Sequence, residues 1–404
     1  MQYSTDDEFS KIEGADEILV GNTNRAESAT ALEGLQENQF RIAYINKKIV
    51  INSTNPDCLL AAAQTFVNEF VTETEIKVPE DLNRVWQCQP GFNYYEVKNP
   101  ILDGGSDPYV TQLDGTYYYC WSGGEGGGVM VSKAASIDKI NYNGKQVVKA
   151  VPGTNWSSEY WAPELHYLNG EWYIYVAADD GEDKNHRMYV FKGTTQDPTD
   201  PFEMIGQITD PTDMWAIDGT VLQYKGEMYF VWSGWATPDS GGHQDLYIAH
   251  MSNPWTIDSD RVMISTPTNG WEGPLNEGPI PVYNGDDVYI VYSGNGSWTA
   301  DYCLGYLKLT GDDPLKANSW EKYGSPILSR NSNAMGPGHC SVATAVDGSQ
   351  WAIYHANPDV AGWDGRTVWI QKLQFSDNGK IKLMKNTKTV MYPEASWVVE
   401  KEIT

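Results

Sequence analysis

Five segments of similar layout follow one another from about residue 90 onward. Each opens with a charged residue or a histidine, passes through a short strand to a Gly, Asn or Asp turn, and ends in a strand rich in Tyr and Trp. Asn-Gly and Asp-Gly turns between such runs indicate β-hairpins. The hairpins are not separated by helical segments of the kind that connect parallel strands. The opening residues lie 54 to 62 positions apart and are Asp107, Glu164, Asp218, Glu277 and His339.

Regularly spaced hairpins favour radial repetition of antiparallel sheets. We therefore predict an all-β fold over residues 86–404, a five-bladed β-propeller with one repeat in each blade. A β-sandwich is the main alternative, but that fold has no reason to repeat a charged strand start five times.

Residues 1–85 follow a different pattern, which predicts a small α/β domain of order β-α-β-β-α. An apolar run at 17–21 precedes a helical segment at 26–36, and two strand-like runs follow at 40–45 and 48–51. Pro56 then opens a longer helix with apolar residues at helical spacing. No catalytic constellation occurs in this part, so we expect it to be structural or accessory, joined to the rest by a linker at 78–83.

The repeated charged position indicates where the chemistry lies. The first strand of each propeller blade lines the central channel, so residues at one equivalent position converge on the axis. Four carboxylates and an imidazole crowded together repel one another and lose hydration. A purely structural site would hold small or apolar residues there, and unrelated surface acids would not recur at one position of each repeat.

Such a cluster is suited to two kinds of chemistry. It could hold a metal ion, although Ca²⁺ takes six to eight oxygen ligands and a histidine is unusual among them. Alternatively, a protonated carboxyl donates to the leaving oxygen of a glycosidic bond while an ionised one activates water. Crowding of like charges raises the pKa of the acid, so hydrolysis explains more of the cluster than metal binding does.

Five motifs in this order resemble glycoside hydrolase family 43 over about residues 95–385: NPILDGGSDPYV, SSEYWAPELH, MWAIDGTVL, LNEGPI and MGPGHCSV. The resemblance implies a five-bladed propeller that hydrolyses with inversion. It implies that Asp107 is the general base, that Asp218 orients and tunes the acid, and that Glu277 is the general acid. Glu164 and His339 match positions that shape the sugar pocket.

The wider context resembles the α-L-arabinofuranosidases of that family, including exo-acting enzymes on α-1,5-linked arabinan. The expected partner is therefore an arabinose-containing oligo- or polysaccharide. The resemblance implies no cofactor for the chemistry, but it implies Ca²⁺ or another ion at the axis beside His339. A β-xylosidase with the same acids and a non-catalytic carbohydrate-binding propeller remain alternatives. The small domain also resembles a truncated α/β domain that precedes several bacterial carbohydrate-active enzymes.

Aromatic side chains near the motifs are candidates for stacking on sugar rings. The chain has 16 Trp and 25 Tyr but only 9 Phe, a bias toward rings with a polar edge, which suits partly wet surfaces. Packing within the blades is an equally good explanation for each ring taken alone. The candidate substrate-binding residues, besides Glu164 and His339, are Trp161, Trp215, Trp235, Trp298 and Arg366.

Charge and cysteine content exclude other classes of partner. The net charge of −26 repels nucleic acid and anionic membranes, and no apolar run of membrane-spanning length occurs. Five cysteines without metal-ligand spacing do not suggest a disulfide framework. The acidic start lacks the apolar region of a signal peptide. These features predict a soluble, reduced, cytoplasmic setting.

Overall fold

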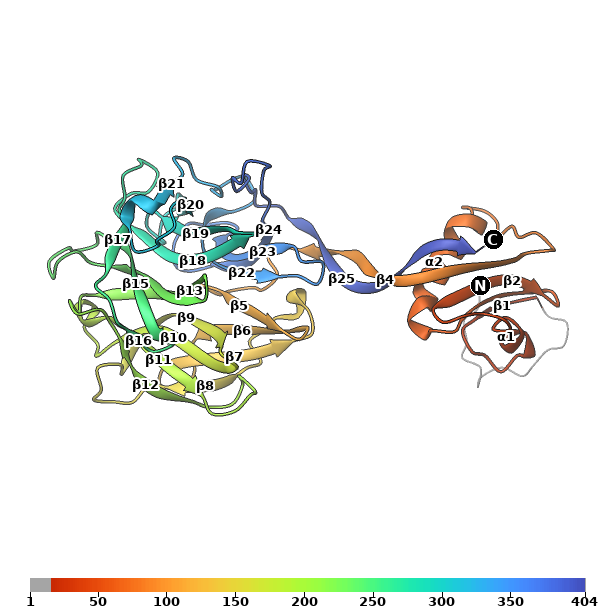
Figure 1. Cartoon of the computed structure of the whole chain (residues 1–404), viewed down its shortest axis with the longest axis horizontal. Coiled ribbons are helices and arrows are strands. Elements are labelled where there is room, and N and C mark those ends of the chain that lie inside the picture. Colours follow the sequence, from red (N-terminus) through yellow and green to blue (C-terminus); the bar gives the residue numbers. More distant parts are fainter. Residues whose placement is uncertain (1–15, 404) are drawn as a thin grey trace. The chain divides into compact units, whose positions relative to one another are not determined.

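The computed structural model describes residues 16–403, so the acidic start on which the signal-peptide prediction rested lies outside the described residues. The chain forms two compact units (Figure 1). The smaller unit comprises Met1–Tyr95 and Tyr392–Thr404, and the larger unit comprises Glu96–Met391. The boundary predicted at residues 85 and 86 therefore falls inside a strand, and the last strand of the chain lies in the smaller unit.

The smaller unit has one five-stranded sheet of order β1-β3-β2-β4-β25. The predicted order of its first five elements is confirmed, although the first helix is shorter than expected. The other two strands of this sheet, β4 and β25, were not predicted. The elements are β1 (Glu17–Val20), α1 (Ala26–Thr30), β2 (Gln39–Ile45), β3 (Lys48–Ser53), a 3-10 turn at Pro56–Cys58, α2 (Leu59–Phe70), β4 (Asn83–Lys98) and β25 (Thr389–Ile403).

Helix α2 forms because its apolar residues recur at helical spacing, and a capped 3-10 turn at Pro56–Cys58 leads directly into it. The Asn55 side chain accepts a hydrogen bond from the Asp57 amide, and Pro56 occupies the first turn. The buried face of the helix packs in one core cluster with Phe40 and Trp86, whose rings stack with centroids 5.1 Å apart. This cluster gives the smaller unit a core of its own.

The larger unit consists of five antiparallel sheets and short 3-10 turns. Within each sheet, consecutive strands pair as hairpins. The first two sheets are β5 (Tyr109–Leu113), β6 (Thr116–Ser122), β7 (Gly128–Ala134), β8 (Lys145–Lys149), and β9 (Ser158–Leu168), β10 (Glu171–Asp179), β11 (Arg187–Gly193), β12 (Phe202–Ile208). The third is β13 (Ala216–Tyr224), β14 (Glu227–Gly234), β15 (Asp245–Asn253), β16 (Thr256–Ile257) and β17 (Val262–Ser265). The last two are β18 (Asn276–Asn284), β19 (Asp287–Gly294), β20 (Cys303–Leu309), β21 (Trp320–Lys322), and β22 (Met335–Thr344), β23 (Gln350–Asn357), β24 (Thr367–Lys372).

The first strands of the five sheets contact one another in a closed circuit. β5 contacts β9, β9 contacts β13, β13 contacts β18, β18 contacts β22, and β22 contacts β5 again. Apolar clusters fill the space between neighbouring sheets, for example between the second and third sheets and between the fourth and fifth. The residues that open β5, β13 and β22 are therefore brought close together although they are far apart in sequence.

The fifth sheet has three strands and is extended by the segment that precedes β5. Leu102 bridges to Val368 of β24. The buried Asn99 side chain donates to the carbonyls of Ile370 and Thr387 and accepts from the Ile370 amide, each at 2.9 Å. Asn99 thereby ties the first segment of the larger unit to its last sheet.

No helix in the described part of the chain has the length and apolar character needed to cross a membrane.

We predict that Asn99→Ala destabilises the larger unit by about 3 kcal/mol, because three side-chain hydrogen bonds are lost and their buried partners stay unpaired. The melting temperature should fall by roughly 5 °C in a calorimetric scan. Asn378→Ala, at an exposed turn, is the matched control and should leave the melting temperature unchanged. Equal melting temperatures for the two variants would contradict the role of Asn99.

Candidate active site

In every sheet of the larger unit, a residue in the first strand or just before it has a positive φ angle. Asp107, Asp218 and His339 have φ angles of 47°, 55° and 46°, in the left-handed region that non-glycine residues rarely adopt. The pairing register shifts next to Asp218 and His339. Such bulges re-aim side chains, and here they turn the three side chains toward one another.

Glu164 and Glu277 are not at the same register position as these three residues. In the second sheet the positive φ belongs to Ala162, two residues before Glu164, and in the fourth sheet it belongs to Gly278, one residue after Glu277. The prediction of one equivalent position for all five residues is therefore wrong in register. It is right that all five lie at the first strands of their sheets.

Gly278 is required at its position. Its φ is +54°, and a Cβ added there would lie 3.1 Å from Cγ of His339. The imidazole thus packs directly against the backbone that follows Glu277. This close approach places the His339 ring beside the carboxyls.

His339 lies at the centre of the cluster. Its Nδ1 is 3.4 Å from Oδ1 of Asp107 and 4.0 Å from Oδ2 of Asp218. Burial lowers the pKa of His339, but the charges of Asp107, Asp218 and Glu277 together raise it above its ordinary value. These carboxyls therefore favour the cationic form of the imidazole.

Asp107 has the most cationic surroundings of the three acids. Besides His339, its Oδ1 lies 3.4 Å from Nδ1 of His355 and 3.8 Å from a guanidinium nitrogen of Arg366. Burial raises the pKa of Asp107, but the charge of His339 and the contacts with His355 and Arg366 outweigh it and bring the pKa well below its ordinary value. Asp107 is thus ionised, and its side chain, 24% exposed, remains open to water.

Glu277 has the opposite environment. The Tyr302 hydroxyl donates a hydrogen bond to Oε1 of Glu277 at 2.8 Å. Burial and the neighbouring charge of Asp218 raise the pKa of Glu277 to about 8, against the lowering effect of His339. Glu277 is therefore protonated at neutral pH.

Asp218 lies between these extremes. It accepts a hydrogen bond from the Gly278 amide at 3.0 Å, so it is attached to the backbone next to Glu277. Burial raises the pKa of Asp218 to about 6 despite the opposing charge of His339. One carboxyl with a proton and two without can do acid–base chemistry on a bound molecule.

Glu164 lies at the edge of this group. Its Oε2 is 2.7 Å from Nε2 of His166, which also lies 3.3 Å from the Tyr109 hydroxyl. The charge of Glu164 contributes to the raised pKa of His339 and of Asp218. Glu164 therefore affects the pKa values of His339 and Asp218 through its charge, and His166 holds its carboxyl in place.

Of the predicted aromatic residues, Trp215 and Trp235 do not line an open site. They are 4% and 8% exposed and stack on each other with centroids 4.8 Å apart, within a core cluster. Trp161 stacks on the buried His186 at 3.9 Å. Trp161 and Trp215 were chosen because they precede Glu164 and Asp218 by three residues. Sequence proximity does not give a shared direction here, because bulges turn successive side chains to different faces.

Trp298 and Arg366 are better placed. Trp298 is 51% exposed, and Arg366 reaches toward Asp107 as described. Sequence reasoning missed Tyr302 and His355, which contact the acids directly. His355 lies in the second strand of the fifth repeat, QWAIYHA, and Tyr302 lies in the stretch GSWTADYCLGYL, which resembles the arabinofuranosidases of the family, so both had a signal that was not used.

The residues at the axis do not fit a metal ion held by protein ligands. No group of three or more His, Cys, Asp or Glu within residues 16–403 is arranged to hold one. In His339, the predicted ligand, Nδ1 lies 3.4 Å from Oδ1 of Asp107 and 4.0 Å from Oδ2 of Asp218.

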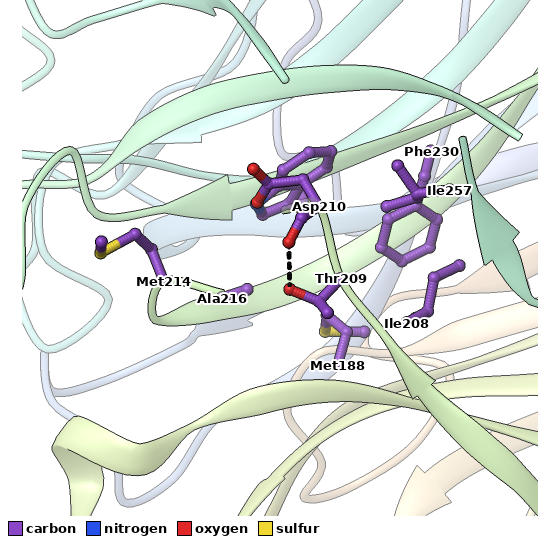
Figure 2. A pocket seen from close by; sticks show the side chains of 9 residues that line it. Met188, Ile208, Thr209, Asp210, Met214, Ala216, Phe230 and Ile257 are labelled. Carbon is purple, nitrogen blue, oxygen red and sulfur yellow. Dashed lines mark hydrogen bonds between the residues drawn. The ribbon is translucent and has the colours of Figure 1, made fainter. Parts of the chain in front are cut away.

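Figure 2 shows a separate small pocket lined by residues of the second and third sheets. Its walls are mainly apolar, including Met188, Phe230 and Ile257. Its one carboxylate, Asp210, accepts hydrogen bonds from the amide and hydroxyl of Thr212. None of the five clustered side chains lines this pocket, so we assign it to packing.

Comparison with known proteins gives a consistent result. A family model described as Glycosyl hydrolases family 43 matches residues 97–381. The chain is 32% identical over 299 residues to a Streptomyces avermitilis protein named extracellular exo-alpha-(1->5)-L-arabinofuranosidase, and the match covers 70% of this chain and 62% of that protein. A Streptomyces chartreusis protein of the same name is 28% identical over 64% of this chain and 82% of its own length. The crystal structure of alpha-L-arabinofuranosidase from Lactobacillus brevis matches with a TM-score of 0.66 and 31% identity, over 72% of this chain and 97% of that one.

The predicted cytoplasmic setting is wrong, since both Streptomyces relatives are named extracellular. The prediction relied partly on unpaired cysteines. All five are buried, and burial raises the pKa of Cys340 to about 12. Buried thiols of this kind are unreactive in any compartment, so their number carries no information about location.

We predict that Glu277→Gln stabilises the larger unit at pH 9 but not at pH 5. The pKa of Glu277 is about 8 in the folded chain against an ordinary value of 4.5, so the folded state keeps a proton that the unfolded state releases, and stability falls as pH rises across this range. The variant should melt about 3 °C higher than the wild type at pH 9. Glu321→Gln, at an exposed position, is the control; a pH-independent difference for Glu277→Gln would contradict the assignment.

Proposed function

This chain belongs to glycosyl hydrolase family 43, and from that premise we propose that it releases terminal α-L-arabinofuranosyl residues from arabinan or arabinose-containing oligosaccharides. The observation that carries the proposal is the division of protons in the cluster. Glu277 holds a proton at neutral pH while Asp107, in the same cluster, does not. Glycoside hydrolysis with inversion needs this combination.

We propose that the five sheets are the blades of a five-bladed β-propeller with the site at its axis. The closed circuit of contacts among the first strands supports this arrangement. The smaller unit has its own core and contributes none of the clustered residues, which supports an accessory role for it.

In the proposed mechanism Asp107 is the general base. It takes a proton from a water whose oxygen forms a bond to the anomeric carbon. Glu277 gives its proton to the leaving oxygen as the glycosidic bond breaks, so that the configuration at the anomeric carbon inverts. Both protons are accounted for by side chains of this chain, and no cofactor is needed.

The remaining residues of the cluster adjust these two. The charge of Asp218 keeps the proton on Glu277, and Tyr302 orients the acid through its hydrogen bond. His339 balances the charge of Asp107 and Asp218. Glu164, His339 and Arg366 are the polar residues we expect to face the sugar.

The sugar specificity rests on the relatives. The chain spans 62% of the S. avermitilis protein, so the activity in that protein's name is carried over as a proposal. The L. brevis arabinofuranosidase, of which 97% is matched, supports the same substrate. A β-xylosidase with the same acids is the second candidate, because a xylosidase structure shares the fold at 16% identity.

The two candidates are separated by rates on 4-nitrophenyl α-L-arabinofuranoside and 4-nitrophenyl β-D-xyloside. We expect kcat/KM to favour the arabinoside by at least about a hundredfold. Proton NMR during hydrolysis should show the β-anomer of arabinose before mutarotation. A preference for the xyloside would overturn the sugar assignment, and an initial α-anomer would overturn inversion. A wild-type chain that binds arabinan without cleaving it would indicate a carbohydrate-binding module.

The role of Glu277 is tested by the leaving group. Methyl α-L-arabinofuranoside has a poor leaving group that needs a proton, whereas 4-nitrophenolate leaves without one. Glu277→Gln should lower kcat/KM by about 10³ for the methyl glycoside and by about tenfold or less for the 4-nitrophenyl glycoside. Glu321→Gln should leave both rates unchanged. Equal losses on both substrates would show that Glu277 is not the acid.

A further inference from the structure

Two exposed indoles lie together in the larger unit. Trp298 is 51% exposed and Trp363 is 61% exposed, and their ring centroids are 5.9 Å apart at an interplanar angle of 75°. Large apolar rings left open to water in pairs often mark a binding surface. The proposed mechanism uses neither of them.

Both rings are held in place although they are exposed. The indole nitrogen of Trp363 donates to the Ser297 hydroxyl at 3.1 Å, which links the two loops. A Cβ added to Gly296 would lie 2.6 Å from the Trp298 ring, so this ring packs flat on its own loop. Rings fixed before binding lose little conformational freedom when a ligand arrives.

Each loop also leads to one of the proposed catalytic groups. The loop carrying Trp298 runs from β19 to β20 and ends at Tyr302, whose hydroxyl contacts Glu277. The loop carrying Trp363 runs from β23 to β24 and ends at Arg366. Arg366 donates to the Trp363 carbonyl at 3.1 Å and reaches Asp107 at 3.8 Å.

We propose that Trp298 and Trp363 form the binding site for the sugar on the leaving-group side of the scissile bond. This inference rests on the proposed function. The acid protonates the leaving oxygen, so the leaving sugar must lie on the Glu277 side of the cluster, where the Trp298 loop ends at Tyr302. The C–H face of a pentose stacks on an indole, and the right-angled pair offers a face and an edge to one ring.

Two substrates with the same reacting sugar and the same kind of leaving oxygen test this site. α-1,5-L-Arabinobiose releases the primary alcohol of a second arabinose, and methyl α-L-arabinofuranoside releases methanol. Only the first substrate therefore has a leaving sugar. We expect Trp298→Ala and Trp363→Ala each to lower kcat/KM for arabinobiose roughly tenfold and to change that for the methyl glycoside less than about twofold. Trp298→Phe, which keeps a stacking face, should recover most of the loss.

Trp255→Ala is the matched control, because Trp255 is 37% exposed in the turn between β15 and β16 of the third sheet. It should leave both rates unchanged. The inference would be overturned if, in both tryptophan variants, the ratio of kcat/KM for arabinobiose to kcat/KM for the methyl glycoside equalled the wild-type ratio, whether or not both values had fallen. A wild-type chain that hydrolyses neither arabinoside would instead show that the proposed function fails, and this inference with it.

Discussion

The attraction between the His339 imidazolium and the surrounding carboxyls is the interaction on which the rest of the site depends. Asp218 and Glu277 are buried at the meeting point of the first strands and the Asp107 side chain is 24% exposed, and burial alone would raise the pKa of all three. A buried cation at 3.4 Å from one of them and 4.0 Å from another lowers the cost of keeping charge there. Without this cation, repulsion among the carboxylates would favour their protonated forms or push apart the first strands of the larger unit.

The backbone carries a cost of its own for this arrangement. Left-handed φ angles at Asp107, Asp218 and His339 cost on the order of 1 kcal/mol or more each. They persist because the sheets around them are fixed by apolar layers between neighbours and by Asn99, which joins the first segment to the last sheet. The circuit of sheets therefore stabilises strained positions that an isolated hairpin would relax.

The sequence predicted the five hairpins and the residues that open them, because a hairpin is a local structure with local turn signals. It predicted that Asp107, Asp218 and Glu277 lie at the first strands for the same reason. It could not show that bulges set Glu164 and Glu277 out of register with the others, since a one-residue shift depends on pairing with the next strand. Tyr302 and His355 reach the acids through tertiary contacts that the sequence does not show. Strand β25 joins its sheet across some 290 residues, so its pairing had no local signal.

The different roles proposed for the three acids follow from their neighbours rather than from residue type. Asp107 faces His339, His355 and Arg366 and loses its proton, whereas Glu277 faces a hydroxyl and the charge of Asp218 and keeps its own. His355 adds no positive charge, since burial lowers its pKa to about 4, and its Nδ1 accepts a hydrogen bond from the Asp107 amide. Apart from Asp218 of the third sheet, the groups that separate the acids come from the fourth and fifth sheets. The same two sheets carry the loops of Trp298 and Trp363, so the elements that set the protonation of the acids are also those placed to hold the leaving sugar.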